Sequence, residues 1–473
     1  MEDDIMGKRS VRIEKICIEN FKNIRKGELD FSNKRKAYKS SILGLYGQNG
    51  SGKTALVDAI HVLKYTLSGQ TLQDEYADYI NIDSSYATLS FEFRVTIDEF
   101  IYGVWYQFSL KKLEYDEDTN FQEKAAEKVK YKVEVFDEIL SYSCFNGANK
   151  VRKGPLINTK TKDVFIPKAK YEELVGNDKT KMVDLLVTKK MMQATSRSFI
   201  FSREMLNVFR KNCSNAEYLS LIESLVVFGN RELYIIKTKN SGLISMNALP
   251  LPFNYKGENT ITYGNLMIPL DSAIPIPEDA YDIVQKVIEN MNIVLKQIVP
   301  DLTIDVVDLG TVLLKNGNMG RSIQLMSLKN GKAIPFKFES EGIKKIVSIL
   351  QLLIVVYNNA SITVAIDEID AGIFEYMLGE LLNIISEKGK GQLIFTSHNL
   401  RPLETIDKGF IAFTTTNPEK RYIRMTNVKG NNNLRDFYYR DIVLGEQNEQ
   451  LYNPTNNFEI ALAFREAGEA FDS

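Results

Sequence analysis

Histidine and cysteine are scarce in this sequence of 473 residues, and each shortage narrows the chemistry available to one chain. The only histidines are His61 and His398, so a multi-histidine metal centre or a His-Asn-His nuclease site cannot be built from a single copy. The three cysteines, Cys17, Cys144 and Cys213, are far apart and form no C-x-x-C pair. This usage is typical of a reducing compartment and argues against a disulfide or cysteine-ligated metal framework.

A strong charge of one sign and a long apolar run are also missing. The net charge is −2, so no global field draws the chain to nucleic acid or to a membrane. The most apolar run, 346–357, is interrupted by Ser348 and Gln351 and is shorter than the roughly 20 residues that span a bilayer. The opening residues MEDDIMGKRS are charged and lack the apolar core of a secretory signal. We therefore expect a cytoplasmic protein of about two to three structural units, without a membrane partner.

A phosphate-binding loop is the most informative motif that is present. Residues 47–54 read GQNGSGKT, which matches G-x-x-x-x-G-K-[ST]. Residues 41–46 predict a buried strand before the loop, and residues 55–63 predict a helix after it, which is the setting that the motif requires. Glycines let backbone N–H groups close around phosphate oxygens, and the helix N-terminus adds its own unpaired N–H groups.

The motif predicts a role for each residue of the loop. Lys53 is expected to reach the β- and γ-phosphates of ATP, and Thr54 is expected to hold Mg²⁺. The predicted ATP contacts are Gly47, Gln48, Asn49, Gly50, Ser51, Gly52, Lys53 and Thr54.

A second nucleotide motif lies far along the chain. Residues 362–368 read ITVAIDE, an apolar, β-branched strand that ends in two acids. Asp367 is placed to hold Mg²⁺ through water, opposite Thr54, and Glu368 is placed to polarise the attacking water. Packing does not explain two adjacent acids at the end of a buried strand, because an unpaired buried charge is costly.

The two histidines have different predicted roles. His398 follows the apolar strand predicted at 391–396, at a strand end where it could contact the γ-phosphate. It is therefore a candidate catalytic residue together with Glu368 and Lys53. His61 lies on the apolar helix after the phosphate loop, where packing is the simpler explanation.

These motifs resemble the ABC-type ATPase heads of the RecF and SMC class. The resemblance rests on residues 47–54, 367–368, 370–371 and 397–398. Between the two nucleotide motifs, residues 338–345 read FESEGIKK and fit the S-x-G core of the signature element. In such heads, Ser340 and Gly342 would bind the γ-phosphate held by a second protomer. The resemblance implies a head-to-tail homodimer with two ATP molecules between the protomers, or a larger oligomer built from it.

The best match is to the smaller OLD-like or abortive-infection ATPases of bacterial anti-phage operons, such as PtuA of Septu systems and AbiLi-like proteins. The chain between Thr54 and Ser340 is too short for an SMC coiled coil and suits a compact insertion. Too few residues follow His398 for a Toprim nuclease domain, and residues 301–305 are not a D-x-D pair. The resemblance therefore implies an ATPase that is not itself a nuclease. It would sense or scaffold for a separate nuclease or toxic effector from the same operon, with DNA or a phage component as a further partner.

Some residues depart from the family pattern or extend it. Ile343 replaces the small or polar residue usual after the signature glycine, and Phe374 stands where SMC heads carry the D-loop aspartate. Both bear on communication between protomers rather than on ATP binding. Lys22, Arg25 and Gln193 are further candidate nucleotide contacts.

The predicted fold is α/β, a P-loop ABC-type ATPase head with a mixed central sheet and a flanking antiparallel sheet. We divide it into an N-terminal lobe (1–165), a mainly helical insertion (166–280) that could form a dimer or partner surface, and a C-terminal lobe (281–473). Periodicity and turn residues predict helices at 182–192, 203–209, 278–298, 341–357 and 374–388, strands at 11–18, 87–95, 302–314 and 391–396, and a loop at 250–264.

Two other functions remain open. A RecF-like DNA-repair ATPase needs a basic surface, and the stretch 150–170 holds seven basic residues against the single acid Asp163. These residues are Lys150, Arg152, Lys153, Lys160, Lys162, Lys168 and Lys170. A solvated loop would explain the same stretch. The ATPase subunit of a transporter is the third function, but nothing in the sequence resembles a surface for a membrane partner.

Overall fold

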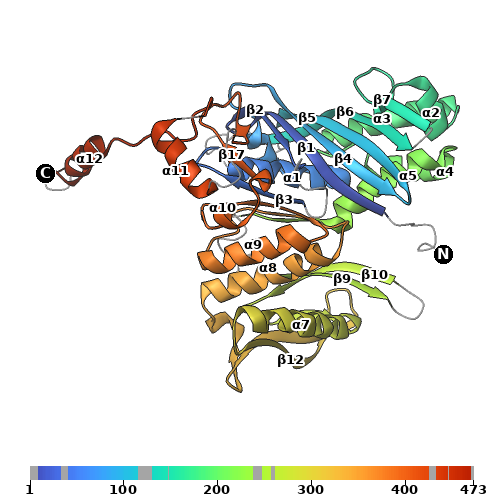
Figure 1. Ribbon diagram of the computed structural model, residues 1–473. Coiled ribbons are helices and arrows are strands. Elements are labelled where there is room, and N and C mark those ends of the chain that lie inside the picture. The colour runs from blue at the N-terminus through green and yellow to red at the C-terminus, as the bar shows by residue number, and fades with distance from the viewer. Residues whose placement is uncertain are drawn as a thin grey trace, which may run out of the picture.

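The computed structural model describes residues 9–32, 41–115, 130–146, 149–237, 248–256, 261–425, 433–445 and 447–469. The charged start of the chain, 1–8, and part of the predicted loop, 257–260, lie outside these residues. In Figure 1 two large sheets lie in the upper part of the molecule, and a smaller sheet with α7 lies in the lower part.

A six-stranded sheet carries the nucleotide motifs. Its order is β18-β17-β3-β16-β15-β8, and all neighbours are parallel except the β17–β18 pair. All residues of β15, β16 and β17 are buried, as expected for parallel strands covered on both faces. The strands are β3 (Ser41–Tyr46), β8 (Leu233–Ile236), β15 (Thr363–Ile366), β16 (Gln392–Thr396), β17 (Ile411–Thr414) and β18 (Tyr422–Ile423).

Successive side chains of this sheet point into two different cores. Leu43, Leu45 and Ala365 belong to a core shared with α1 (Lys53–Leu67) and the antiparallel sheet. Val364 and Ile366 belong to a second core, shared with α8 (Glu341–Asn358) and α9 (Glu375–Lys388). The helix α1 therefore lies between the two sheets, while α8 and α9 cover the opposite face (Figure 1).

The antiparallel sheet has the strand order β2-β1-β4-β5-β6-β7. In β4 the burial alternates residue by residue, because one face packs on the core and the other faces solvent. The short helix η1 (Asp74–Tyr79) packs against its inner face. The strands are β1 (Arg9–Phe21), β2 (Ile24–Asp30), β4 (Tyr86–Ile97), β5 (Phe100–Tyr115), β6 (Lys130–Asn146) and β7 (Asn149–Asn158).

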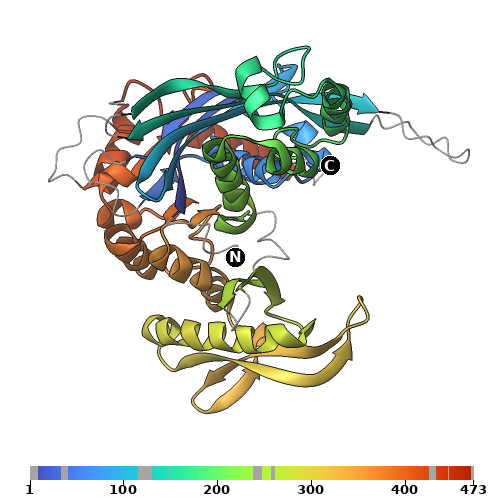
Figure 2. The ribbon, with the colours of Figure 1, turned by 90° about the vertical axis from the view of Figure 1, so that its right-hand side faces the viewer.

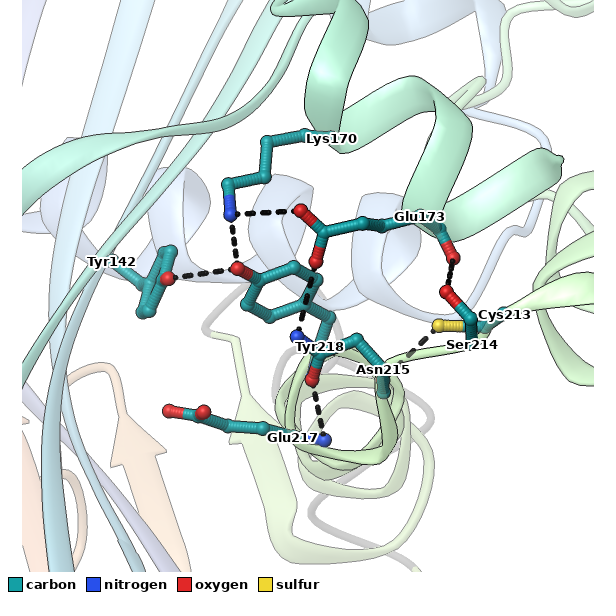
Figure 3. A network of polar contacts seen from close by, with 8 residues as sticks. All are labelled: Tyr142, Lys170, Glu173, Cys213, Ser214, Asn215, Glu217 and Tyr218. Atoms are coloured by element: carbon teal, nitrogen blue, oxygen red, sulfur yellow. Dashed lines mark hydrogen bonds and ion pairs between the residues drawn. The ribbon is translucent and has the colours of Figure 1, made fainter. Parts of the chain in front are cut away.

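Four helices follow β7 and pack on this sheet: α2 (Lys168–Val175), α3 (Lys179–Ala194), α4 (Arg203–Asn212) and α5 (Ala216–Val227). Hydrogen bonds connect α2 with α5 and β6 (Figure 3). Glu173 accepts a hydrogen bond from Asn215 Nδ2 at 3.1 Å and pairs with Lys170. Lys170 also donates to the Tyr218 hydroxyl, which lies 3.2 Å from the Tyr142 hydroxyl.

The four helices that pack on the antiparallel sheet occupy only about the first half of the predicted insertion. After α5 and the single turn η2 (Phe228–Glu232), the chain enters the central sheet as β8, which pairs with β15. After β8 the described part of the 166–280 segment contributes further strands, including β11 (Ile274–Pro277), and then the first residues of the helix that starts at Glu278. The boundaries of the three units stay a prediction.

The predicted loop at 250–264 is wrong in its described part, because that part forms a hairpin. Strand β9 (Ala248–Lys256) pairs with β10 (Ile261–Pro269), and Pro250 stands opposite Met267. Among the described residues this sheet consists of two strands, so each strand has an edge where a residue without an N–H group is tolerated.

The lower part of the molecule is a small α/β layer that connects to α8. Helix α7 (Glu278–Ile298), as predicted, lies along a sheet of β11, β13 and β12, and β14 pairs with β13 (Figure 2). These strands are β12 (Leu302–Leu313), β13 (Met319–Lys329) and β14 (Lys332–Pro335), and the single turn η3 (Phe336–Phe338) leads into α8.

The C-terminal part returns to the central sheet before the chain leaves the body. It contains α10 (Pro402–Thr405), η4 (Lys408–Phe410), α11 (Leu434–Leu444) and α12 (Asn457–Glu469), and α12 projects from the body in Figure 1. None of the described helices combines the length and apolarity needed to cross a bilayer.

Candidate functional site

The phosphate loop lies between β3 and α1, at the carboxyl edge of the central sheet. Gly50 and Gly52 have φ angles of 73° and 94°, in the left-handed region that favours glycine. Gly52 is the N-cap of α1 and provides no capping side chain, so the first N–H groups of the helix are available to an anion. The sequence pattern and the local geometry therefore agree on an anion-binding loop.

A cavity of about 260 Å³ opens beside this loop. It brings together the loop, the end of the second motif and the first turn of the chain, which are far apart in sequence. Its lining residues are Lys22, Asn23, Asn49, Gly50, Gly52, Lys53, Thr54, Ala55, Glu368 and His398.

The ammonium group of Lys53 is folded over its own loop. Its Nζ donates to the carbonyl oxygens of Gly47 at 2.8 Å and Gln48 at 3.0 Å. Burial lowers the pKa of Lys53, and the nearby Asp367 and Glu368 act in the opposite direction. Both carbonyl partners are neutral, so phosphate oxygens would be the stronger partners for this buried cation.

Asp367 and Thr54 face each other as the motifs predict. Thr54 Oγ1 lies 3.4 Å from Asp367 Oδ1, and Asp367 is fully buried. The Thr396 hydroxyl, at the end of the neighbouring strand β16, donates to the same oxygen at 2.6 Å and accepts from the Glu368 backbone N–H at 2.8 Å. Thr396 thus orients both acids, a role that sequence reasoning missed. A polar residue at the end of a buried strand next to the acidic strand was its only signal.

Glu368 and His398 lie at the open side of the loop. Glu368 has a φ of 50°, a left-handed conformation that is uncommon for this residue type and that accompanies the turn after β15. The backbone N–H of His398 donates to Asp370 Oδ2 at 3.1 Å. Burial and then the charge of Lys53 lower the pKa of His398, which favours its neutral imidazole, while Asp370, Glu368 and Asp367 act in the opposite direction. A second cavity of about 360 Å³ shares Asn49, Glu368 and His398.

The predicted signature residues, Ser340 and Gly342, lie elsewhere on the same chain. Ser340 is the N-cap of α8, with its hydroxyl accepting from the Ile343 N–H at 3.4 Å. A Cβ at Gly342 would come within 2.6 Å of the Gly372 carbonyl oxygen, so only glycine permits this contact with the loop after β15. Neither Ser340 nor Gly342 lines the cavity beside the phosphate loop.

The remaining candidates are spread over different parts of the structure. Gln48 directs its Oε1 to the backbone N–H of Asn453 at 2.8 Å, toward the C-terminal part of the chain. Arg25 forms ion pairs with acids at the surface, and Gln193 lies on α3. Neither residue lines the cavity. Lys22 does line it. Phe374, the N-cap of α9, is 71% exposed.

A family model matches most of the chain. The model described as "RecF/RecN/SMC N terminal domain" matches residues 12–420. The chain belongs to this family. The predicted fold class is thereby confirmed, an α/β ABC-type ATPase head with antiparallel sheets and helical regions. Members of the family are ATP-binding ATPases.

Individual relatives match either a short part of the chain or the whole chain at low sequence identity. The DNA replication and repair protein RecF of Azobacteroides pseudotrichonymphae genomovar. CFP2 is 42% identical over 77 residues, which are 16% of this chain and 19% of that relative's length. An SMC head from Thermotoga maritima has a TM-score of 0.37 at 14% identity, over 88% of this chain and 99% of that one. The recombination mediator protein RecF-ATPrS has a TM-score of 0.35 at 12% identity, over the same shares. These relatives leave the OLD-like assignment a prediction.

Proposed function

We propose that the protein is a Mg²⁺-dependent ATPase whose ATP-bound heads pair head to tail. In this proposal it is the cytoplasmic sensor or scaffold subunit of a bacterial anti-phage complex, and a separate effector supplies the nuclease or toxic activity. The observation that carries the ATPase part is the convergence of the phosphate loop, Glu368 and His398 on one cavity, with Thr54 3.4 Å from Asp367.

The residues present fit ATP and Mg²⁺. Thr54 and Asp367 offer the hydroxyl and carboxylate oxygens that Mg²⁺ prefers, and Mg²⁺ would neutralise charge on the phosphates. Lys53 would exchange its two carbonyl partners for phosphate oxygens. Glu368 would orient and deprotonate the attacking water, and the neutral His398 would contact the γ-phosphate at the mouth of the cavity.

The position of the signature residues supports the dimer. Ser340 and Gly342 begin α8 and do not line the cavity beside the chain's own phosphate loop, so in this proposal they contact the nucleotide of a second protomer. The α8 N-terminus would add N–H groups to the γ-phosphate there. Pairing of two such surfaces gives a symmetric dimer with two composite sites.

Glu368→Gln is expected to separate ATP binding from hydrolysis. The amide keeps the shape of the site but cannot accept the water proton, so hydrolysis should fall by about 100-fold or more. ATP binding should survive, and the closed dimer should accumulate. Phosphate release and size-exclusion chromatography with and without ATP measure the two effects. A normal turnover rate in this variant would remove Glu368 from the chemistry.

A DNA-repair role is the second candidate, because the RecF relative shares 42% identity over its matched segment and the 150–170 stretch is basic. That stretch is partly neutralised by ion pairs: Lys160 with Asp137 at 3.7 Å, Lys168 with Glu172 at 3.7 Å and Lys170 with Glu173 at 3.3 Å. Lys153 stacks over the Trp105 ring at 4.1 Å.

Duplex DNA distinguishes the two roles. A repair ATPase should shift DNA in a gel at low salt, lose most of that binding by about 200 mM salt, and bind less after Arg152→Glu/Lys153→Glu. An anti-phage scaffold should instead protect cells from phage only when the neighbouring gene is co-expressed. The protection should disappear with Lys53→Ala.

A further inference from the structure

Two ammonium groups share one buried carboxylate next to the nucleotide cavity. Asp58 lies on α1, one turn after Thr54, and its side chain is 1% exposed. Lys22 hydrogen-bonds to its Oδ2, and Lys237, at the end of β8, lies 2.8 Å from its Oδ1. The side chain of Lys237 is 8% exposed, whereas that of Lys22 is 25% exposed and lines the cavity.

The other described side chains of this cluster add no negative charge. His61 Nδ1 lies 2.5 Å from the Tyr76 hydroxyl and 3.2 Å from Lys237 Nζ. Burial, and then the charge of Lys237, lower the pKa of His61 to about 4, so the imidazole is neutral at pH 7. Burial also raises the pKa of Tyr76, which keeps its hydroxyl protonated. The cluster therefore holds one more positive charge than negative charge beside an anion-binding loop.

Of the two lysines, Lys22 is the one that lines the nucleotide cavity. Its backbone has a φ of 52°, the left-handed region that is uncommon for lysine. The structure around it fixes this conformation: its N–H donates to the Tyr79 carbonyl at 2.6 Å, and its carbonyl accepts from Asn81 Nδ2 at 2.7 Å. A strained backbone held in this way commonly positions a functional side chain.

We propose that Asp58 and Lys237 form a charge clamp that allows Lys22 to leave for the phosphate groups of ATP. The clamp rests on the ATP site of the proposed function and adds positioning residues to it. When Lys22 turns into the cavity, Lys237 remains on Asp58, so the buried carboxylate keeps a counter-ion. Without Lys237, every departure of Lys22 would leave a buried and unpaired charge, which is strongly unfavourable.

The clamp is also linked to the metal-binding edge. The carbonyl of Ile236, next to Lys237, accepts a hydrogen bond from the Asp367 N–H at 2.9 Å. Strand β8 therefore fixes Lys237 relative to the same edge of the sheet that carries Thr54 and Asp367.

Lys237→Met is the direct test. Lys22 becomes the only counter-ion of Asp58, so ATP binding should weaken by about 30-fold or more, the range seen when one partner of a buried charge pair is removed. Lys237→Arg keeps the charge and should bind ATP nearly as well as the wild type. Titration with a fluorescent ATP analogue measures the affinity, and thermal unfolding without nucleotide measures the stability of each variant.

A second substitution separates positioning from structure. In Asp58→Asn/Lys237→Met the buried charge is gone, Lys22 is free to leave, and ATP affinity should return close to that of the wild type. The matched control is Lys64→Met, a lysine of the same helix whose Nζ donates to the Leu233 carbonyl at 2.7 Å. It should leave ATP affinity unchanged, because Lys64 does not line the cavity and does not pair with Asp58.

Three outcomes would overturn the clamp: wild-type affinity in Lys237→Met, a double variant that binds as weakly as Lys237→Met, or an equal loss of affinity in Lys64→Met. If Lys237→Met does not fold, Lys237→Gln gives the same comparison, because it keeps N–H donors but no charge. Failure of the wild-type protein itself to bind ATP would overturn the proposed function instead, so the two failures are distinguishable.

Discussion

Lys53→Ala is expected to lower ATP affinity by about 100-fold or more. A charge-assisted hydrogen bond contributes roughly 1.5–3 kcal/mol, and Lys53 would make more than one to the β- and γ-phosphates. Each 1.4 kcal/mol corresponds to about tenfold in affinity. Fluorescence titration with an ATP analogue measures the loss, and Mg²⁺-dependent phosphate release should disappear with it. Unchanged affinity in this variant would refute the assignment of the phosphate loop.

The same variant should not lose stability without nucleotide. Burial lowers the pKa of Lys53, which means that the folded protein disfavours its charged form. A lysine with a lowered folded-state pKa opposes folding at pH values below its unfolded pKa of about 10.4. Removing it should leave the unfolding temperature unchanged or slightly higher. A large fall in the unfolding temperature would mean that the affinity loss reports misfolding rather than lost phosphate contacts.

Motif spacing made the centre of this molecule predictable from sequence. The strand, glycine-rich loop and helix predicted at 41–63 follow the order that the phosphate-loop motif requires. The run ITVAIDE predicts a buried strand whose two acids end at the same edge of the sheet. Long periodic segments were equally clear, since α7 spans Glu278–Ile298 as predicted. In each case the local pattern and the tertiary structure favour the same answer.

The other features of the fold and the site could not be predicted, because they depend on contacts between residues that are far apart in the sequence. The run LYII at 233–236 is too short to distinguish a central strand from a loop, and only its pairing with β15 reveals it. The prolines of β9 predicted a loop, because proline lacks the N–H group that an inner strand needs. The sequence does not show that β9 pairs with β10 alone among the described strands, where proline is tolerated. The Asp58 cluster joins Lys22 and Lys237, which no local motif connects.

Ser340→Arg should abolish hydrolysis while leaving ATP binding intact. Each protomer keeps its own phosphate loop, because Ser340 does not line the cavity beside Lys53. The arginine would place a bulky cation where the partner's γ-phosphate must dock at the α8 N-terminus, so the closed dimer should not form. Phosphate release and ATP-dependent dimerisation measured by size-exclusion chromatography test this. Ser340→Ala is the matched control, because it removes the hydroxyl without blocking the surface.

Mixing variants tests whether the two motifs act across the interface. In a dimer of one Lys53→Ala protomer and one Ser340→Arg protomer, one composite site keeps both its phosphate loop and its signature serine, and the other site loses both. A dimer of either variant alone has two damaged sites. If one intact site is sufficient for hydrolysis, activity should return only in the mixture. Phe374 is 71% exposed and is predicted to stand where SMC heads carry the D-loop aspartate, so the recovered rate also reports how strongly the sites are coupled. If Ser340→Arg alone hydrolyses ATP at the wild-type rate, Ser340 is not the signature serine and the sandwich dimer is wrong.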